Sequence, residues 1–115
     1  MMNPPLKEEV RRCFSYLFEK WGFEFVDLKD DFGGNVVIAQ SGKLRIRFIR
    51  DRADFFLDVG NTLEAEQWTS FYKVLDQLRL SGRVNGEYKY SNRMKAISKL
   101  LNQYFPVVKG FRTIR

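Results

Sequence analysis

The segment KLRIRFIRDRADFFLDVG, residues 43–60, decides the fold because its side chains alternate in character along the chain. Apolar and basic residues take turns through its first half: Leu44, Arg45, Ile46, Arg47 and Phe48. A period of two residues is typical of a strand that buries one face. After RDRAD the alternation resumes with acids in place of the bases. The segment therefore predicts two antiparallel strands, residues 43–50 and 53–60, joined by a tight turn.

Two further strands are expected upstream of this hairpin. Residues 23–31, FEFVDLKDD, and residues 35–40, NVVIAQ, have the apolar content of short strands, and the glycines between them indicate a turn. Ser41-Gly42 is suited to a two-residue hairpin turn. Because no helix-length segment separates the four strands, they are expected to form an antiparallel meander.

Three helices are predicted around the strands. Apolar residues at helical spacing indicate one helix over residues 5–21. A second is expected to start near Asn61 or Thr62, with Trp68 in its buried stripe, and a third to follow residue 91. Pro106 is expected to end the third helix, because proline interrupts helical hydrogen bonding.

The expected order, one helix, four strands and two helices, favours an α+β fold. We predict a two-layer sandwich in which the N-terminal helix and the two C-terminal helices cover one face of the four-stranded meander. The chain has 115 residues, 44% of them hydrophobic, which suits a single domain over residues 1–115 with one packed core.

The other face of the sheet is expected to mix apolar and charged side chains. With Asp51-Arg52 as a two-residue loop, Arg45 would lie opposite Asp58. Six residues are predicted to form a contact surface on this face: Ile38, Arg45, Arg47, Ile49, Phe56 and Asp58. Such a surface indicates a protein partner or a second copy of the chain. Coverage by a later helix and stacking of RNA bases are the alternatives.

The net charge of +6 is concentrated in the last third of the chain. Residues 1–82 carry 12 basic and 13 acidic side chains, whereas residues 83–115 carry eight basic side chains and one acid. This asymmetry supports nucleic-acid binding as an alternative function. The candidate phosphate contacts are Lys89, Arg93, Lys95, Lys99, Lys109 and Arg112.

The residue types present argue against common catalytic chemistry. The chain has no histidine and a single cysteine, Cys13, so His-based triads and zinc sites are not expected. We predict a protein that is not an enzyme and holds no cofactor or metal. Two groups of aspartates keep carboxylate catalysis formally open: Asp27, Asp30, Asp31 and Asp51, Asp54, Asp58.

No apolar run approaches the ~20 residues that a membrane helix needs, and the first residues lack the apolar centre of a signal peptide. The sequence therefore predicts a cytoplasmic protein without membrane contact.

The segment RFIRDRADFFLDVG, followed by Glu66 and Trp68, resembles a group of small bacterial proteins of unknown function. Their hairpin has the pattern RFxRDRG-x-xFxDxG, with Ala53 here in place of its glycine. Some of these proteins look like immunity proteins encoded near polymorphic toxins. Over residues 44–72 the resemblance implies a small cytoplasmic binding protein without catalysis, and it identifies no partner.

Overall fold

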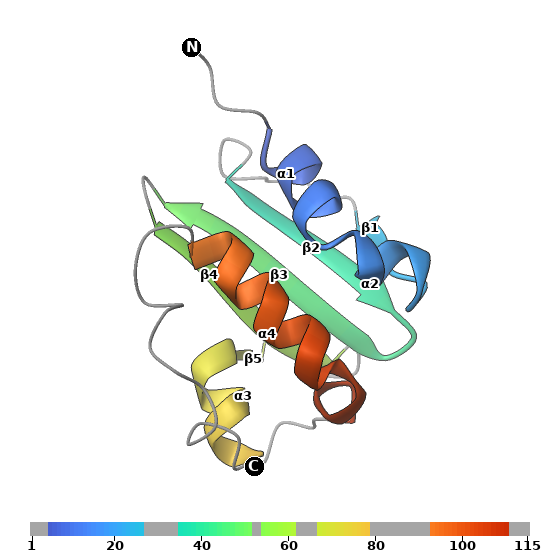
Figure 1. Cartoon of the computed structure of the whole chain (residues 1–115), viewed down its shortest axis with the longest axis vertical. Helices are drawn as coiled ribbons and strands as arrows, with labels where there is room; N and C mark the ends of the chain where they lie inside the picture. The colour runs from blue at the N-terminus through green and yellow to red at the C-terminus, as the bar shows by residue number, and fades with distance from the viewer. Residues whose placement is uncertain (1–4, 27–34, 52–53, 62–66, 79–92, 111–115) are drawn as a thin grey trace.

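Five antiparallel strands form one sheet in the order β1-β2-β3-β4-β5 (Figure 1). The computed structural model describes residues 5–26, 35–51, 54–61, 67–78 and 93–110. The strands are β1 (Glu24–Val26), β2 (Val36–Ser41), β3 (Leu44–Asp51), β4 (Asp54–Asn61) and β5 (Trp68–Ser70). The helices are α1 (Leu6–Cys13), α2 (Ser15–Glu19), α3 (Phe71–Gln77) and α4 (Arg93–Val108). The predicted α+β class with an antiparallel meander is confirmed.

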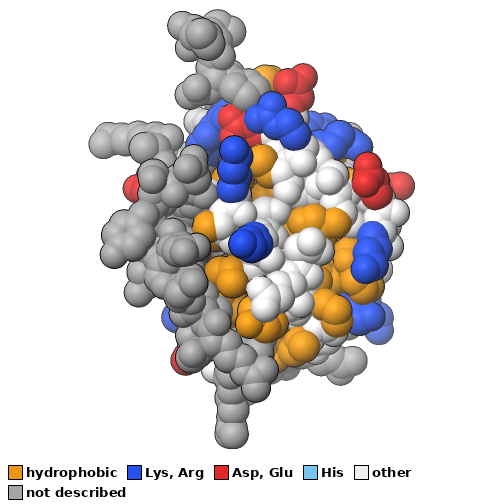
Figure 2. Space-filling model, in the orientation of Figure 1, with side chains coloured by type: hydrophobic (Ala, Val, Ile, Leu, Met, Phe, Trp, Pro, Cys, Tyr) orange, Lys and Arg blue, Asp and Glu red, His pale blue; other side chains and the backbone are white. Residues whose placement is uncertain are grey.

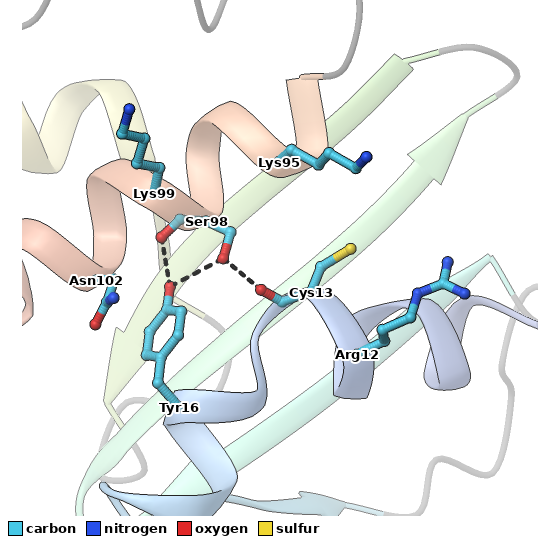
Figure 3. Close-up of a pocket in the computed structure, with 7 residues that line it drawn as sticks. All are labelled: Arg12, Cys13, Tyr16, Lys95, Ser98, Lys99 and Asn102. Atoms are coloured by element: carbon cyan, nitrogen blue, oxygen red, sulfur yellow. Dashed lines mark hydrogen bonds between the residues drawn. The ribbon is translucent and has the colours of Figure 1, made fainter.

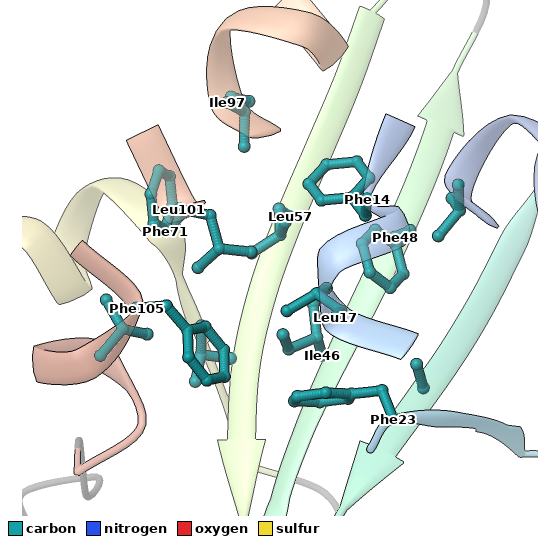
Figure 4. Close-up of a cluster of buried hydrophobic side chains, with 14 of the residues drawn as sticks. Phe14, Leu17, Phe23, Ile46, Phe48, Leu57, Phe71, Ile97, Leu101 and Phe105 are labelled. Carbon is teal, nitrogen blue, oxygen red and sulfur yellow. The ribbon is translucent and has the colours of Figure 1, made fainter. Parts of the chain in front are cut away.

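The core lies between the sheet and the helices (Figure 4). In Figure 1, α1, α2 and α4 lie in front of the sheet, and α3 lies beside β5. Apolar side chains of β3 and β4 point into this core, as their alternation predicts: Leu44, Ile46, Phe48, Phe55, Leu57 and Val59. Every described helix adds buried side chains to the same cluster, so one core holds the two layers together.

The predicted N-terminal helix is divided at Phe14, whose backbone leaves the helical region at φ −116° and ψ 33°. Its ring is fully buried and lies 5.0 Å from the ring of Phe48 and 6.0 Å from that of Phe55, measured between centroids. The break leaves the Cys13 carbonyl outside regular helical bonding, and the Ser98 hydroxyl donates to it at 2.6 Å. The helix thus breaks where Phe14 packs into the core and Ser98 bonds to the Cys13 carbonyl. The helical spacing of apolar residues did not predict this break, because it does not contain these tertiary contacts.

The predicted pairing of β3 and β4 is wrong by two residues. Arg47, not Arg45, faces Asp58, and Arg45 faces Gly60. Asp51 faces Asp54 at the hairpin end, so the connection is residues 52–53. The turn before β3 is likewise one residue later, at Gly42-Lys43, where Gly42 has φ +59°. A shift of two residues keeps every side chain on its own face, so the alternation could not distinguish the two registers.

A fifth strand replaces the predicted start of the second helix. Residues 68–70 pair with β4, with Thr69 opposite Val59, so Trp68 belongs to the sheet. Helix α3 begins only at Phe71, and Ser70 caps it by accepting a hydrogen bond from the Lys73 amide at 3.4 Å. Asn61 is the last residue of β4, and Thr62 lies outside the described residues.

Pro106 lies inside α4, which continues to Val108, so the prediction that it ends the helix is wrong. The additional turn buries Val108 completely, and Phe105 just before it is also buried. The Lys109 amide donates to the Phe105 carbonyl at 2.8 Å and closes the turn. Burying a valine contributes about 1.5 kcal/mol or more, which offsets part of the cost of proline in a helix.

None of the described helices combines the length and the apolar character needed to cross a membrane.

Candidate functional site

The sheet has a second face, opposite the core, which carries the residues predicted to form a contact surface. By register this second face holds Ile38, Arg45, Arg47, Ile49, Phe56 and Asp58 on β2, β3 and β4. Because the buried residues of α3 and α4 belong to the core on the other side, neither helix builds a second core here. Among the described elements, the second face is formed by strands alone.

Arg47 and Asp58 form an ion pair at the centre of the second face. Arg47 donates from Nε at 3.0 Å and from Nη2 at 2.7 Å, both to Oδ2 of Asp58. The two side chains are 30% and 14% exposed, so the pair is partly screened from water. The charge of Arg47 is thus compensated within the chain. The sequence predicted Arg45 as the partner of Asp58, and the two-residue difference in register replaces it with Arg47.

Trp68 covers the two arginines from β5. Its ring centroid lies 4.6 Å from Cζ of Arg47 and 5.5 Å from Cζ of Arg45. Gly60 permits this position, because it faces Trp68 across the strand pair and has no side chain. A Cβ atom at Gly60 would lie only 3.0 Å from Cε3 of Trp68. The stacked guanidinium groups make cation–π contacts with the indole.

Arg45 differs from Arg47 in its polar contacts. Its Nε is buried and has no hydrogen-bond partner in the described part of the chain. Leaving a buried donor unsatisfied costs about 1–3 kcal/mol. Arg45 also forms no ion pair with a described residue, whereas the charge of Arg47 is compensated by Asp58.

The apolar residues of the second face differ in exposure. The Phe56 side chain is 37% exposed, and Ile49 opposite it is half-buried. Ile38 is only 7% exposed. Phe56 and Ile49 offer apolar area to a partner, whereas Ile38, although it lies on the second face by register, is buried and offers very little.

The basic residues of the alternative nucleic-acid surface do not form one row. Lys95 and Lys99 extend from α4 beside α1, while the Lys109 Nζ lies at the end of α4, 4.8 Å from the ring centroid of Trp21. Arg93 begins α4, but its side chain is not described. Lys89 and Arg112 lie outside the described residues.

Helix α4 is joined to the N-terminal helices by a small polar network. The Tyr16 hydroxyl donates to the Ser98 carbonyl at 2.6 Å, and the Ser98 hydroxyl donates to the Cys13 carbonyl at 2.6 Å. Burial raises the pKa of Tyr16 well above its usual 10.0, although its hydrogen bonds oppose the shift. The phenol therefore stays neutral through the physiological range and keeps its donor role.

The described carboxylates do not assemble into a metal site. Within residues 5–26, 35–51, 54–61, 67–78 and 93–110, no three His, Cys, Asp or Glu side chains gather closely enough. Asp58 is held by Arg47, and Asp51 and Asp54 face each other at the end of the hairpin. The other aspartates of the catalytic alternative, Asp27, Asp30 and Asp31, lie outside the described residues.

Trp68 is the site residue that sequence reasoning missed. Its spacing to Phe71 and Tyr72 indicated the buried stripe of a helix. The available signal was the pair of β-prone residues Trp68 and Thr69 directly before Ser70, a residue that favours helix N-caps. Three residues are too short for an alternation to be recognised, so only the pairing with β4 reveals the strand.

No family model, curated protein or solved structure matches this chain. The immunity-like interpretation of residues 44–72 therefore depends on the hairpin pattern alone.

Proposed function

We propose that this chain is a non-catalytic binding protein whose second face holds an acidic segment of another protein. The observation that supports the proposal is that Arg47 and Arg45 differ in their polar contacts. Arg47 has its carboxylate in Asp58, whereas Arg45 has a buried Nε without an acceptor among the described residues. The Arg45 side chain as a whole is half-buried and forms no ion pair with a described residue, so an Asp or Glu side chain of a partner would provide its counter-charge.

Trp68 helps to hold the guanidinium of Arg45 ready for this contact. Its ring contacts the guanidinium groups of both arginines. An arginine that is already restrained by stacking loses less side-chain entropy when it binds a partner. Trp and Arg are also the residues that most often dominate the energy of protein interfaces. The cluster of Arg45, Arg47 and Trp68 is thus suited to be the central anchor.

Phe56 and Ile49 provide the apolar part of the proposed contact. They face each other across β3 and β4, along the same face as the arginine cluster. A partner segment with a carboxylate next to an apolar side chain would match both parts. An immunity-like role, which the hairpin resemblance implies, is one instance, in which the acidic segment belongs to a toxin.

The experiment compares Arg45→Glu with Lys73→Glu, a charge reversal at an exposed position of α3. Proteins that wild type captures from cell extract are identified, purified and titrated by calorimetry. We expect Arg45→Glu to weaken the partner by about tenfold or more, because a charge-assisted hydrogen bond becomes a repulsion. Lys73→Glu, with the same net charge, should bind within about twofold of wild type, because Lys73 lies away from the cluster.

A second variant, Phe56→Asp, tests the apolar part of the surface. It should keep the circular dichroism spectrum of wild type and lose the partner, because Phe56 is partly exposed. Equal affinity of Arg45→Glu and wild type for the purified partner would contradict the proposal. Self-association that Arg45→Glu abolishes, seen by analytical ultracentrifugation, would replace the foreign partner with a second copy of this chain.

A further inference from the structure

A cavity of about 490 Å³ opens where α1, α2 and α4 meet, on the helical side of the molecule (Figure 3). It is separate from the second face, because these helices lie on the core side of the sheet. Seven of the described residues line it: Arg12, Cys13, Tyr16, Lys95, Ser98, Lys99 and Asn102. A volume of this order lies within the range of small-molecule sites.

Hydrogen bonds between elements fix the walls of the cavity. Tyr16 is bonded to the Ser98 carbonyl, and Ser98 is bonded to the Cys13 carbonyl, so α1, α2 and α4 are joined where they border the cavity. Both hydroxyl protons are used inside the wall. The donors that remain for a ligand are therefore the cationic side chains and the amide of Asn102.

The described side chains that line the cavity carry a net positive charge. Arg12, Lys95 and Lys99 are cationic, and none of the described residues of the lining carries a carboxylate. In Figure 3, Lys95 reaches from α4 toward the side of α1, where Arg12 and Cys13 lie. Tyr16 adds no negative charge, because burial keeps its phenol protonated. Figure 2 shows basic side chains, with acidic ones among them, over the part of this face where α1 and the start of α4 lie.

We propose that this cavity binds a phosphate group of an organic phosphate. In Figure 3 the charged ends of Arg12 and Lys95 lie on the same side of the cavity, and a guanidinium with an ammonium group matches a dianionic phosphate better than a single carboxylate. Lys99 points in another direction and adds attraction for the anion at longer range. The cavity is larger than a phosphate ion, which leaves room for part of the molecule that carries it. The phosphate can belong to a small metabolite or to the backbone of a nucleic acid, and the two sources differ in the rest of the ligand.

The test uses inorganic pyrophosphate, titrated by calorimetry at low salt into the full chain. The pocket variant is Lys95→Gln/Lys99→Gln, and the matched control is Lys43→Gln/Lys73→Gln, which removes the same charge from exposed positions outside the cavity. We expect wild type to bind in the range of about 1 mM or tighter. The pocket variant should weaken binding by about tenfold, and the control by less than about twofold.

Amide spectra locate the site independently of affinity. Pyrophosphate should shift the amide resonances of Arg12, Cys13, Tyr16, Ser98 and Asn102 in wild type. Shifts confined to other segments, equal losses in the pocket and control variants, or no binding at millimolar pyrophosphate would each overturn the proposal, because each points to general charge attraction or to none.

Two further ligands distinguish the sources of the phosphate. Adenosine monophosphate that binds more tightly than pyrophosphate and is displaced by it identifies a small phosphorylated compound as the ligand. A 20-nucleotide RNA whose affinity falls steeply with salt and is lost in the pocket variant identifies a nucleic-acid backbone. Either result supports the phosphate site. RNA binding that the pocket variant retains places RNA elsewhere and does not support the cavity.

Discussion

At the scale of single residues, Gly60 determines how the second face is built. It lies opposite Arg45 on one side and opposite Trp68 on the other, in the row that joins β3, β4 and β5. The absence of a side chain lets the indole approach the strand and reach both guanidinium groups. A residue without a side chain thus makes possible the contact between an aromatic ring and two cations.

This role of Gly60 leads to a prediction. Gly60→Ala places a Cβ atom 3.0 Å from both the Gln67 carbonyl oxygen and Cε3 of Trp68, so the ring and the edge strand must move. We expect the free energy of unfolding to fall by about 1–3 kcal/mol, as for other overpacked sites. Urea denaturation measures the loss, and the fluorescence of Trp68 should change in the native state.

Gly110→Ala is the control for this experiment. A Cβ atom at Gly110 would lie 3.6 Å from the nearest backbone oxygen, an ordinary contact, so the stability should stay within about 0.5 kcal/mol of wild type. Equal stabilities of Gly60→Ala and Gly110→Ala would show that Trp68 is not held against β4.

At the scale of elements, α4 shows that the burial of side chains can outweigh the tendency of proline to end a helix. Pro106 lacks the amide that would bond to the Asn102 carbonyl, yet the helix continues for two more residues. Val108 reaches the core only if the last turn forms, and its burial is complete. The hydrophobic contribution of that turn thus acts against the local preference of proline.

Pro106→Ala should therefore stabilise the protein. The side chain of Pro106 is exposed, so little packing is lost, and the alanine restores a helical hydrogen bond. We expect the free energy of unfolding to rise by about 1 kcal/mol or more. Thermal unfolding measured by circular dichroism at 222 nm checks the change. A lower melting temperature would mean that the proline ring contributes packing that its exposure does not indicate.

At the scale of the whole molecule, the sheet separates the two proposed sites. The arginine cluster and the cavity lie on opposite sides of the sheet. The largest fully buried side chains of the core between them are all apolar. Arg45→Glu and Lys95→Gln/Lys99→Gln each lower the net charge of +6 by two units. Effects of overall charge on binding are therefore the same in both variants.

The two variants should show opposite selectivity. Arg45→Glu should lose the protein partner and bind pyrophosphate within about twofold of wild type, and the pocket variant should do the reverse, because distant sites without shared partners act independently. Calorimetric titration of each variant with both ligands checks this. Loss of both ligands in either variant would mean that the sites are coupled or that the variant does not fold.

The periodic patterns of the sequence predicted the layers but not the pairing. Alternation placed Arg45, Arg47 and Phe56 on one face and Ile46 on the other, and the register confirms this division. It could not select between registers that differ by two residues, so Arg45 was assigned to Asp58 in error. The candidate site was accordingly predicted by face, while the identity of the ion pair was not.

The sequence by itself determined which side chains of β3 and β4 share a face and which of them point into the core, because the spacing of apolar side chains follows from the period of the strand that contains them. Only the tertiary structure decided that Trp68 joins the sheet, that Asp58 pairs with Arg47, and that Tyr16 and Ser98 border a basic cavity. These features depend on contacts between residues far apart in the chain, up to 82 positions for Tyr16 and Ser98. A local pattern contains no information about such contacts, since their energy exists only after the elements have packed together.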